Sequence, residues 1–130
     1  MQRIVEQAAS LAGASIAAVS VIDRSRQWFA AKVGIDDSEK PRSESFCAFA
    51  ILRPGEPLIV CDAMRDPRFA QNPAVLGVPH VRFYAGIPLV DRSGYALGAL
   101  CVADTQPRRD DFDVYDLTHL AREAERLMQP

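Results

Sequence analysis

Three cysteines are the residues with the widest range of possible chemistry in this sequence. Cys47, Cys61 and Cys101 are 14 and 40 residues apart and stand among apolar neighbours. The pattern lacks the C-x-x-C spacing of zinc and thioredoxin-type sites, and an odd number of cysteines does not make a disulfide framework. We therefore expect reduced, mostly buried thiols, which are typical of a cytoplasmic protein, and no metal site.

The two histidines, His80 and His119, predict no catalytic site. They are far apart in the sequence, and neither accompanies a G-x-S-x-G motif or another nucleophile motif. The glycines form no phosphate-binding or dinucleotide-binding fingerprint, so nucleotide-triphosphate chemistry is not expected. His80 is the one loop histidine that offers an axial ligand for haem, and a surface position is the commoner explanation for such a residue.

The charge and composition of the chain exclude several classes of protein. With 15 Lys and Arg against 17 Asp and Glu, the net charge is −2, whereas nucleic-acid binding needs a basic excess. Hydrophobic residues make up 48% and charged residues 25%, as in a globular domain. Apolar runs such as residues 46–52 are far shorter than the ~20 residues of a membrane span. We expect one domain, residues 1–130, with no nucleic-acid partner and no membrane span.

Local patterns in the first third of the chain predict a helix, a hairpin and a loop. Apolar residues recur at helical spacing over residues 2–12, and Gly13 then offers a left-handed cap. Residues 15–23 and 27–33 are rich in β-branched and aromatic side chains around a polar turn, which indicates a β-hairpin. Residues 34–44 carry turn formers and charge without periodicity, so we expect a loop there.

The middle of the chain alternates short elements with a long connection. Ser45 is a suitable N-cap for a short apolar helix over residues 46–52. Residues 57–61 indicate a brief buried strand. The proline-rich segment 62–80 is long for a routine connection, and such segments are usually functional or disordered. We expect an ordered loop with a helical turn over residues 73–76.

The last third predicts a second hairpin and a terminal helix. Residues 82–90 and 95–103 are the clearest strands, and Gly94 suits the positive φ of their turn. Both faces of the strand 95–103 are apolar, so both must be covered. A helix over residues 113–128 carries apolar residues at helical spacing. The carboxylates around its start, Asp110, Asp111 and Asp113, complement the positive end of the helix dipole. This order of elements predicts an antiparallel α+β fold.

Several strings of residues occur in the order typical of one known family. They are Ser20-Val-Ile-Asp23 with Gln27-Trp-Phe29, Pro41-Arg42 with Ser45-Phe-Cys-Ala48 and Ala50-Ile51, Pro57-Leu58 with Val60 and Asp62, Asp66-Pro-Arg-Phe-Ala70 with Asn72-Pro73, Arg82-Phe-Tyr-Ala-Gly86 with Pro88-Leu89, Gly94 with Leu97-Gly98, and Leu100-Cys-Val102 with Asp104 and Pro107-Arg108. On these residues, which extend over essentially the whole chain, the sequence resembles a GAF domain of bacterial sensor kinases and cyclic-di-nucleotide signalling proteins.

The resemblance implies a regulatory domain without catalytic activity. Its expected fold is a central antiparallel sheet of five to six strands, with terminal helices on one face and loops and short helices on the other, where a small ligand binds. Such domains commonly form homodimers through their terminal helices, here 2–12 and 113–128. They pass a ligand-dependent change to an attached kinase or cyclase output domain. The chain is then either a stand-alone protein or an excised sensory fragment, and its ligand or cofactor is unknown.

The resemblance also implies a ligand-binding face. Its candidate residues are Ser45, Phe46, Cys47, Asp62, Asp66, Arg68, Phe69, Asn72, Arg82 and Tyr84. Arg68 and Arg82 would hold an anionic ligand, because only guanidinium offers a bidentate fork. A purely structural explanation competes with ligand binding for this set: Asp66 caps a turn, Arg68 and Arg82 bridge loop carbonyls or carboxylates, and Phe69 lies in the core.

Two other functions of the family depend on cysteines that this sequence lacks at the required positions. Free methionine-R-sulfoxide reductases use a cysteine that corresponds to Cys47 and a nucleophilic cysteine before the strand that begins at Arg82. Residues 77–81 contain no cysteine, so this activity is not expected. Bilin attachment is not expected either, because its cysteine beside a loop histidine and its acidic-proline motif are missing.

A purely structural dimerisation or interaction module is the main alternative to a sensor. A cavity lined by Arg68, Arg82 or Tyr84 would favour ligand sensing. A face closed by Phe49, Phe69 and Phe83 would favour the interaction module.

Overall fold

One antiparallel sheet organises the chain. The computed structural model describes residues 1–22, 26–35, 39–41, 45–109 and 112–128. Within them the sheet has six strands in the order β3-β2-β1-β6-β5-β4. The strands are β1 (Ile16–Ile22), β2 (Arg26–Val33), β3 (Glu39–Pro41), β4 (Leu58–Val60), β5 (Phe83–Val90) and β6 (Ala96–Asp104). The long strands β1, β6 and β5 form its centre, and the shortest strands lie at its edges.

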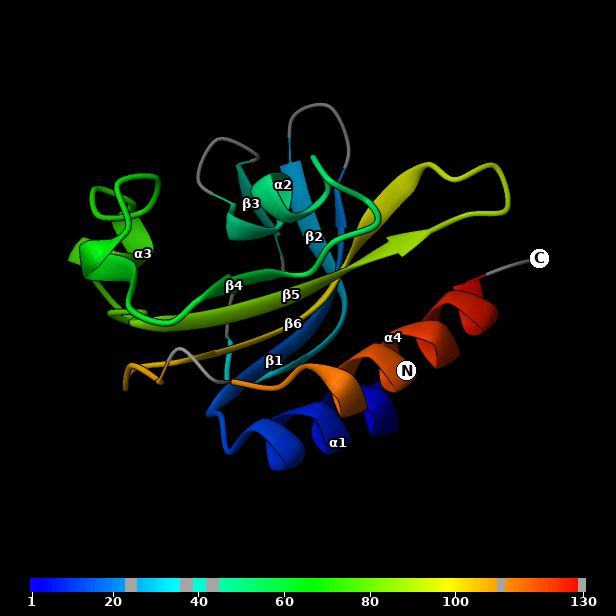
Figure 1. Ribbon diagram of the computed structural model, residues 1–130, viewed down its shortest axis with the longest axis horizontal. Coiled ribbons are helices and arrows are strands. Elements are labelled where there is room, and N and C mark those ends of the chain that lie inside the picture. Colours follow the sequence, from blue (N-terminus) through cyan, green and yellow to red (C-terminus); the bar gives the residue numbers. More distant parts are fainter. Residues whose placement is uncertain (23–25, 36–38, 42–44, 110–111, 129–130) are drawn as a thin grey trace.

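Helices cover both faces of the sheet (Figure 1). The helices α1 (Gln2–Ala12) and α4 (Tyr115–Met128) pack side by side on one face. The other face carries α2 (Phe46–Ala50), α3 (Pro73–Leu76) and the 3-10 turn η2 (Ala63–Arg65). This arrangement confirms the predicted α+β fold, with terminal helices on one face and short helices on the other.

The terminal helices follow the predicted pattern of burial. Ile4, Val5 and Ala8 of α1 are buried, and α1 is followed by the cap Gly13, whose φ of 60° is the left-handed conformation expected of a glycine cap. Asp113 accepts a hydrogen bond at 2.8 Å from the backbone N–H of Tyr115, the first residue of α4. This bond satisfies a donor that the helix itself leaves free. The other expected carboxylates, Asp110 and Asp111, lie outside the described residues.

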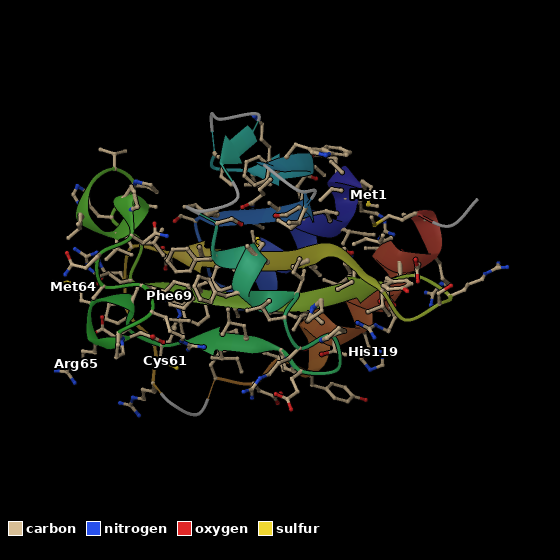
Figure 2. All side chains as sticks on the ribbon, turned by 90° about the horizontal axis from the view of Figure 1, so that it is seen from above. Met1, Cys61, Met64, Arg65, Phe69 and His119 are labelled. Carbon is tan, nitrogen blue, oxygen red and sulfur yellow. The ribbon has the colours of Figure 1, made fainter. Side chains whose placement is uncertain are left out.

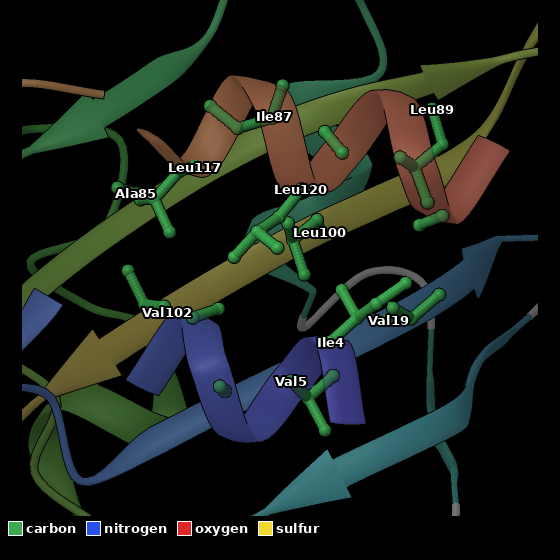
Figure 3. Packing of buried hydrophobic residues seen from close by; sticks show 14 of the residues in the cluster. Ile4, Val5, Val19, Ala85, Ile87, Leu89, Leu100, Val102, Leu117 and Leu120 are labelled. Carbon is green, nitrogen blue, oxygen red and sulfur yellow. The ribbon is translucent and has the colours of Figure 1, made fainter. Parts of the chain in front are cut away.

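Strand β6 separates two hydrophobic cores. Leu100 and Val102 point toward α1 and α4, where they join Ile4, Val5, Leu117 and Leu120 (Figure 3). Ala99 and Cys101 point to the opposite face and pack beneath α2. Since neighbouring residues of a strand point to opposite faces, the expected cover on both sides of β6 is confirmed. Each face therefore has its own buried core.

The structure corrects three details of the predicted elements. Strand β3 lies within the segment 34–44, for which only a loop was expected; its pairing with the edge of β2 outweighs its weak strand propensity. Helix α2 ends at Ala50, before the expected end at residue 52, and Leu52 is exposed. Leu127, which belongs to the apolar pattern predicted for residues 113–128, is 58% exposed, because at about 100° per residue it lies at the margin of the buried stripe of α4.

None of the helices in the described part of the chain is long and apolar enough to span a membrane.

Candidate functional site

A pocket of about 380 Å³ opens on the face of the sheet that carries α2 and α3. Its floor comes from β1, β2, β5 and β6, and its sides from α2 and the segment 74–81. The lining residues are Ile16, Gln27, Phe29, Gly34, Ile35, Ser45, Phe46, Cys47, Ala74, Val78, Pro79, Val81, Tyr84, Cys101 and Ala103. This volume lies near the lower end of the ~300–1,000 Å³ of small-molecule sites.

A hydrogen-bonded chain of polar side chains forms one wall of the pocket. Ser45 caps α2 by accepting a bond at 3.1 Å from the backbone N–H of Ala48, and its hydroxyl donates to Gln27 Oε1. The Gln27 amide Nε2 donates at 2.9 Å to Ser20 Oγ. Ser45 and Gln27 line the pocket, and Ser20 supports Gln27 from outside the lining. All three side chains are buried, and Gln27 is only 5% exposed. A buried amide needs such partners, since an unpaired one costs about 1–3 kcal/mol.

The polar chain continues through a thiol to a phenol. Ser20 Oγ lies 3.2 Å from Cys47 Sγ, and Cys47 Sγ lies 2.9 Å from the hydroxyl of Tyr84. Burial is the main cause that raises the pKa of Tyr84 well above its ordinary value, and the neighbouring thiols add to it. The pKa of Cys101 is also well raised, by its hydrogen bond with Cys47 and by burial. Both groups keep their protons at neutral pH and interact with a ligand as neutral groups.

Aromatic packing holds α2 over the sheet. The ring of Phe46 stacks on Phe69 with centroids 4.4 Å apart, and Phe49 meets Phe69 edge to face at 5.0 Å. Phe69 is fully buried and lies inward from the edge of the molecule in Figure 2. It comes from the long connection between β4 and β5, so that connection supports the helix that carries Ser45 and Cys47.

Three of the predicted site residues lie away from this pocket. Asp62, Asp66 and Arg68 line a wider, more open depression of about 700 Å³ beside β4. Figure 2 shows Arg65, which also lines this depression, at one edge of the molecule.

Arg68 and Asp66 form an ion pair in this depression. The guanidinium donates to both oxygens of Asp66 at 2.7 and 3.0 Å. Hydrogen bonds from Arg68 hold the pKa of Asp66 below its ordinary value, although burial opposes the shift. The structural explanation of this pair, as a capped turn with a bridging arginine, agrees with the geometry.

Two further predicted residues stabilise the segment that forms one side of the pocket. Asn72 caps α3 by accepting a bond at 2.8 Å from the backbone N–H of Ala74. Arg82 donates to the carbonyl oxygens of Val75 and Val81, each at 3.0 Å. Of the ten predicted residues, the pocket lining includes Ser45, Phe46, Cys47 and Tyr84. The other six hold the surrounding connection or line the second depression.

The sequence did not single out Gln27, which β2 contributes to the pocket lining, or its hydrogen-bond partner Ser20 of β1, which is not itself a lining residue. Both belong to the resemblance, but neither was expected to contact a ligand. The available signal was a polar residue at an inward position of each strand, since buried polar side chains are uncommon without a specific role. Cys101 was expected to be a buried strand residue, and it also lines the pocket. Cys61 is only half-buried, which differs from the expected burial.

Metal and haem ligands are not assembled in the part of the chain that the structure describes. No group of three or more His, Cys, Asp or Glu side chains gathers there to hold a metal ion. His80 is exposed and does not line the pocket, and His119 is an exposed residue of α4 whose ring packs on Tyr115.

The chain matches the GAF domain family over residues 1–128. It is similar to a cyclic di-GMP phosphodiesterase of Pseudomonas aeruginosa, with 47% identity over 123 residues. The match covers 93% of this chain and 21% of that protein, so the chain spans about a fifth of the length of this relative.

Solved structures share the fold at low sequence identity. The GAF domain of an Acinetobacter phosphoenolpyruvate-protein phosphotransferase superposes with a TM-score of 0.72 at 19% identity, covering 97% of this chain and 77% of that chain. A free methionine-R-sulfoxide reductase of Neisseria meningitidis gives 0.73 at 18% identity, with coverage of 96% and 73%. The type II enzyme of Thermoplasma acidophilum gives 0.71 at 16%, with coverage of 95% and 84%. Since the family match extends over nearly the whole chain, this protein belongs to the GAF domain family.

Proposed function

We propose that this GAF domain is a non-catalytic sensor that binds a small molecule in the pocket beneath α2 and α3. The observation that carries the proposal is the pocket itself, which combines apolar walls with a short row of buried polar groups. This combination is typical of small-molecule sites. Tyr84 lines the cavity, whereas Phe83 points to the opposite face of the sheet. The geometry therefore favours sensing over a module whose face is closed by Phe49, Phe69 and Phe83.

A short path of hydrogen bonds connects the pocket to α1. Ala103 lines the pocket, and the next residue, Asp104, accepts from Arg108 at 2.8 Å. Arg108 also donates at 2.9 Å to the carbonyl oxygen of Gly13, the residue that caps α1. A ligand that shifts the end of β6 would change this connection. In our proposal the change reaches the terminal helices by this route.

The proposed target of the signal is an attached output domain. The similar Pseudomonas protein is a cyclic di-GMP phosphodiesterase, and this chain corresponds to about a fifth of it. We propose that the present domain regulates an attached cytoplasmic enzymatic domain of this kind, or a kinase or cyclase, and performs no catalysis itself.

The reductase alternative has little support from the site. The fold is shared with methionine sulfoxide reductases at 16–18% identity, which is a likeness of fold alone. Residues 77–81, where the nucleophilic cysteine would stand, contain none. Cys47 is 1% exposed and hydrogen-bonded to Ser20 and Tyr84. A nucleophilic thiol, in contrast, must be accessible to the substrate and activated as a thiolate.

Homodimerisation through α1 and α4 is part of the proposal. The two helices lie side by side, joined by an ion pair between Arg3 and Glu123, and expose apolar side chains that include Leu11 and Leu127. We expect sedimentation to show a dimer that Leu11→Glu with Leu127→Glu weakens. A wild-type protein that stays monomeric at high concentration would contradict this part.

Native mass spectrometry tests the binding function. Protein purified from cells is compared with Ala74→Phe, which fills the pocket from α3, and with Leu76→Phe, an exposed position on the same helix outside the pocket. We expect a small molecule retained by the wild type and Leu76→Phe and lost from Ala74→Phe. Retention of the same molecule by Ala74→Phe would contradict a site in this pocket.

A further inference from the structure

The charge of the pocket lining limits the chemistry of a ligand. None of the residues that the structure shows lining the pocket is a Lys, Arg, Asp, Glu or His. The polar groups on its walls are an amide, a hydroxyl, a phenol and two thiols, from Gln27, Ser45, Tyr84, Cys47 and Cys101. The amide and the hydroxyl carry no charge, and Tyr84 and Cys101 keep their protons because their pKa values are raised.

The nearest predicted anion-binding arginines have other partners. Arg82 donates to the carbonyl oxygens of Val75 and Val81 at the back of the pocket wall. Arg68 forms its ion pair with Asp66 in the separate depression beside β4. Neither guanidinium lines the pocket. A carboxylate or phosphate that entered the cavity would therefore lose its hydration without gaining a counter-charge from the described lining, which is costly.

The buried polar groups of the pocket wall have hydrogen-bond partners without a ligand. Within the described residues, every buried side-chain nitrogen and oxygen has a hydrogen-bond partner. The row that joins Ser45, Gln27 and Ser20 is held by its own bonds. A ligand can still donate a hydrogen bond to Gln27 Oε1 or to the Tyr84 hydroxyl, because each oxygen can accept two hydrogen bonds. Ile16 and Phe29 form apolar walls beside these groups. These groups match one or two weakly polar groups on a mainly apolar molecule.

We infer that the pocket takes an uncharged, mainly apolar metabolite with a hydroxyl, amide or similar neutral donor, and discriminates against carboxylates and phosphates. This inference rests on the proposed function, because it specifies the ligand of the same pocket. It places the two phosphates of a cyclic dinucleotide outside this site. The arginines named by sequence reasoning then serve the surrounding framework and not the ligand.

A matched pair of probes tests the inference. Indole-3-acetamide and indole-3-acetate have nearly the same shape and differ in charge, and tryptamine supplies the cation. Calorimetric titration at pH 7 compares their affinities for the wild type, Ala74→Phe and Leu76→Phe. We expect the amide to bind at least about tenfold more tightly than either ion, since burying an unpaired charge is costly. Binding should disappear in Ala74→Phe and persist in Leu76→Phe.

Equal or tighter binding of the carboxylate, still abolished by Ala74→Phe, overturns the neutral-ligand inference and leaves the proposed binding site in place. Absence of binding by all three probes overturns the inference, and the native mass spectrum then decides separately whether the pocket holds any molecule. If Ala74→Phe does not fold, nuclear Overhauser contacts from the indole protons to the methyl groups of Ala74 and Ala103 in the wild type locate the probe. Their absence at saturation places binding elsewhere and contradicts the inference.

Discussion

The phenol ring of Tyr84 lies directly over Gly86, two residues farther along β5. A Cβ atom built on Gly86 would come within 2.8 Å of the ring carbons Cε1 and Cζ of Tyr84. The absence of a side chain at Gly86 therefore allows the ring to lie along the strand. In that position its hydroxyl reaches Cys47 Sγ at 2.9 Å and the polar wall of the pocket.

The substitution Gly86→Ala tests this relationship. The added methyl must displace Tyr84 and break its bond to Cys47, so we expect a loss of about 1–3 kcal/mol of unfolding free energy, typical of overpacking a core. Urea denaturation measures the change. Gly55→Ala is the matched control, because nothing lies within 4 Å of a Cβ at Gly55. Equal stability of the two variants would show that Tyr84 does not need this space.

Ser45 holds two parts of the site together. Ser45→Ala removes the cap of α2 and leaves Gln27 Oε1 without its hydroxyl donor. We expect a loss of about 1–3 kcal/mol, the cost of a lost cap or of an unpaired buried group. Chemical denaturation compares it with Ser10→Ala, at an exposed position of α1 that should change stability by less than about 0.5 kcal/mol. A neutral Ser45→Ala would contradict the structural role of the polar wall.

Alkaline pH should destabilise the domain through the pocket. The folded state raises the pKa of Tyr84 and of Cys101, so above about pH 8.5 the unfolded chain releases protons that the folded chain keeps. Their contribution to stability is complete below that pH and is lost as the pH rises toward the folded values. The urea midpoint of unfolding should change less between pH 7 and pH 10 in Tyr84→Phe than in the control Tyr95→Phe, because Tyr95 is exposed. Identical pH dependence of the two variants would rule out Tyr84 as a source of the effect.

Asp104 joins the end of β6 to the end of α1. Burial works against its ionisation, but hydrogen bonds from Arg108, Ser15 and Thr105 prevail and hold its pKa below the ordinary value. We expect Asp104→Asn to lose about 1–3 kcal/mol at pH 7, as for a hydrogen bond to a charged group.

Measurements at acid pH provide a second test of the role of Asp104. A depressed pKa contributes stability above roughly pH 4, and the contribution is lost as the pH falls through the folded value. The difference between wild type and Asp104→Asn should therefore shrink in acid, whereas Glu6→Gln, on the exposed side of α1, should follow the wild type. A constant difference across this range would show that the carboxylate charge contributes nothing.

The elements with strong local signals could be predicted from the sequence. The glycine after α1, the Ser45 cap and the turn over residues 73–76 each carry a local backbone signal, and each lies where it was expected. Strand β3 lacks such a signal. Its residues form turns readily, and only the neighbouring edge of β2 makes them a strand.

The site was predictable only in part, for a similar reason. Ser45 and Cys47 were recognised as a short string, and Tyr84 by its place in a strand. The role of Gln27 depends on the register of β1 against β2, which places it opposite Ile22 after an irregularity at Val19 and Ser20. Such a register is a property of strand pairing and turn geometry, so the contact of Gln27 with Ser20 and Ser45 could not be seen in the sequence.

The most direct test of the account is a two-dimensional NMR titration of the ¹⁵N-labelled domain with indole-3-acetamide. We predict that the largest amide shift changes occur at pocket residues such as Gln27, Cys47 and Ala74, with smaller changes at Asp104, Arg108 and Gly13 along the connection to α1. Changes confined to the depression around Asp66 and Arg68 would contradict the claim that this pocket is the sensing site.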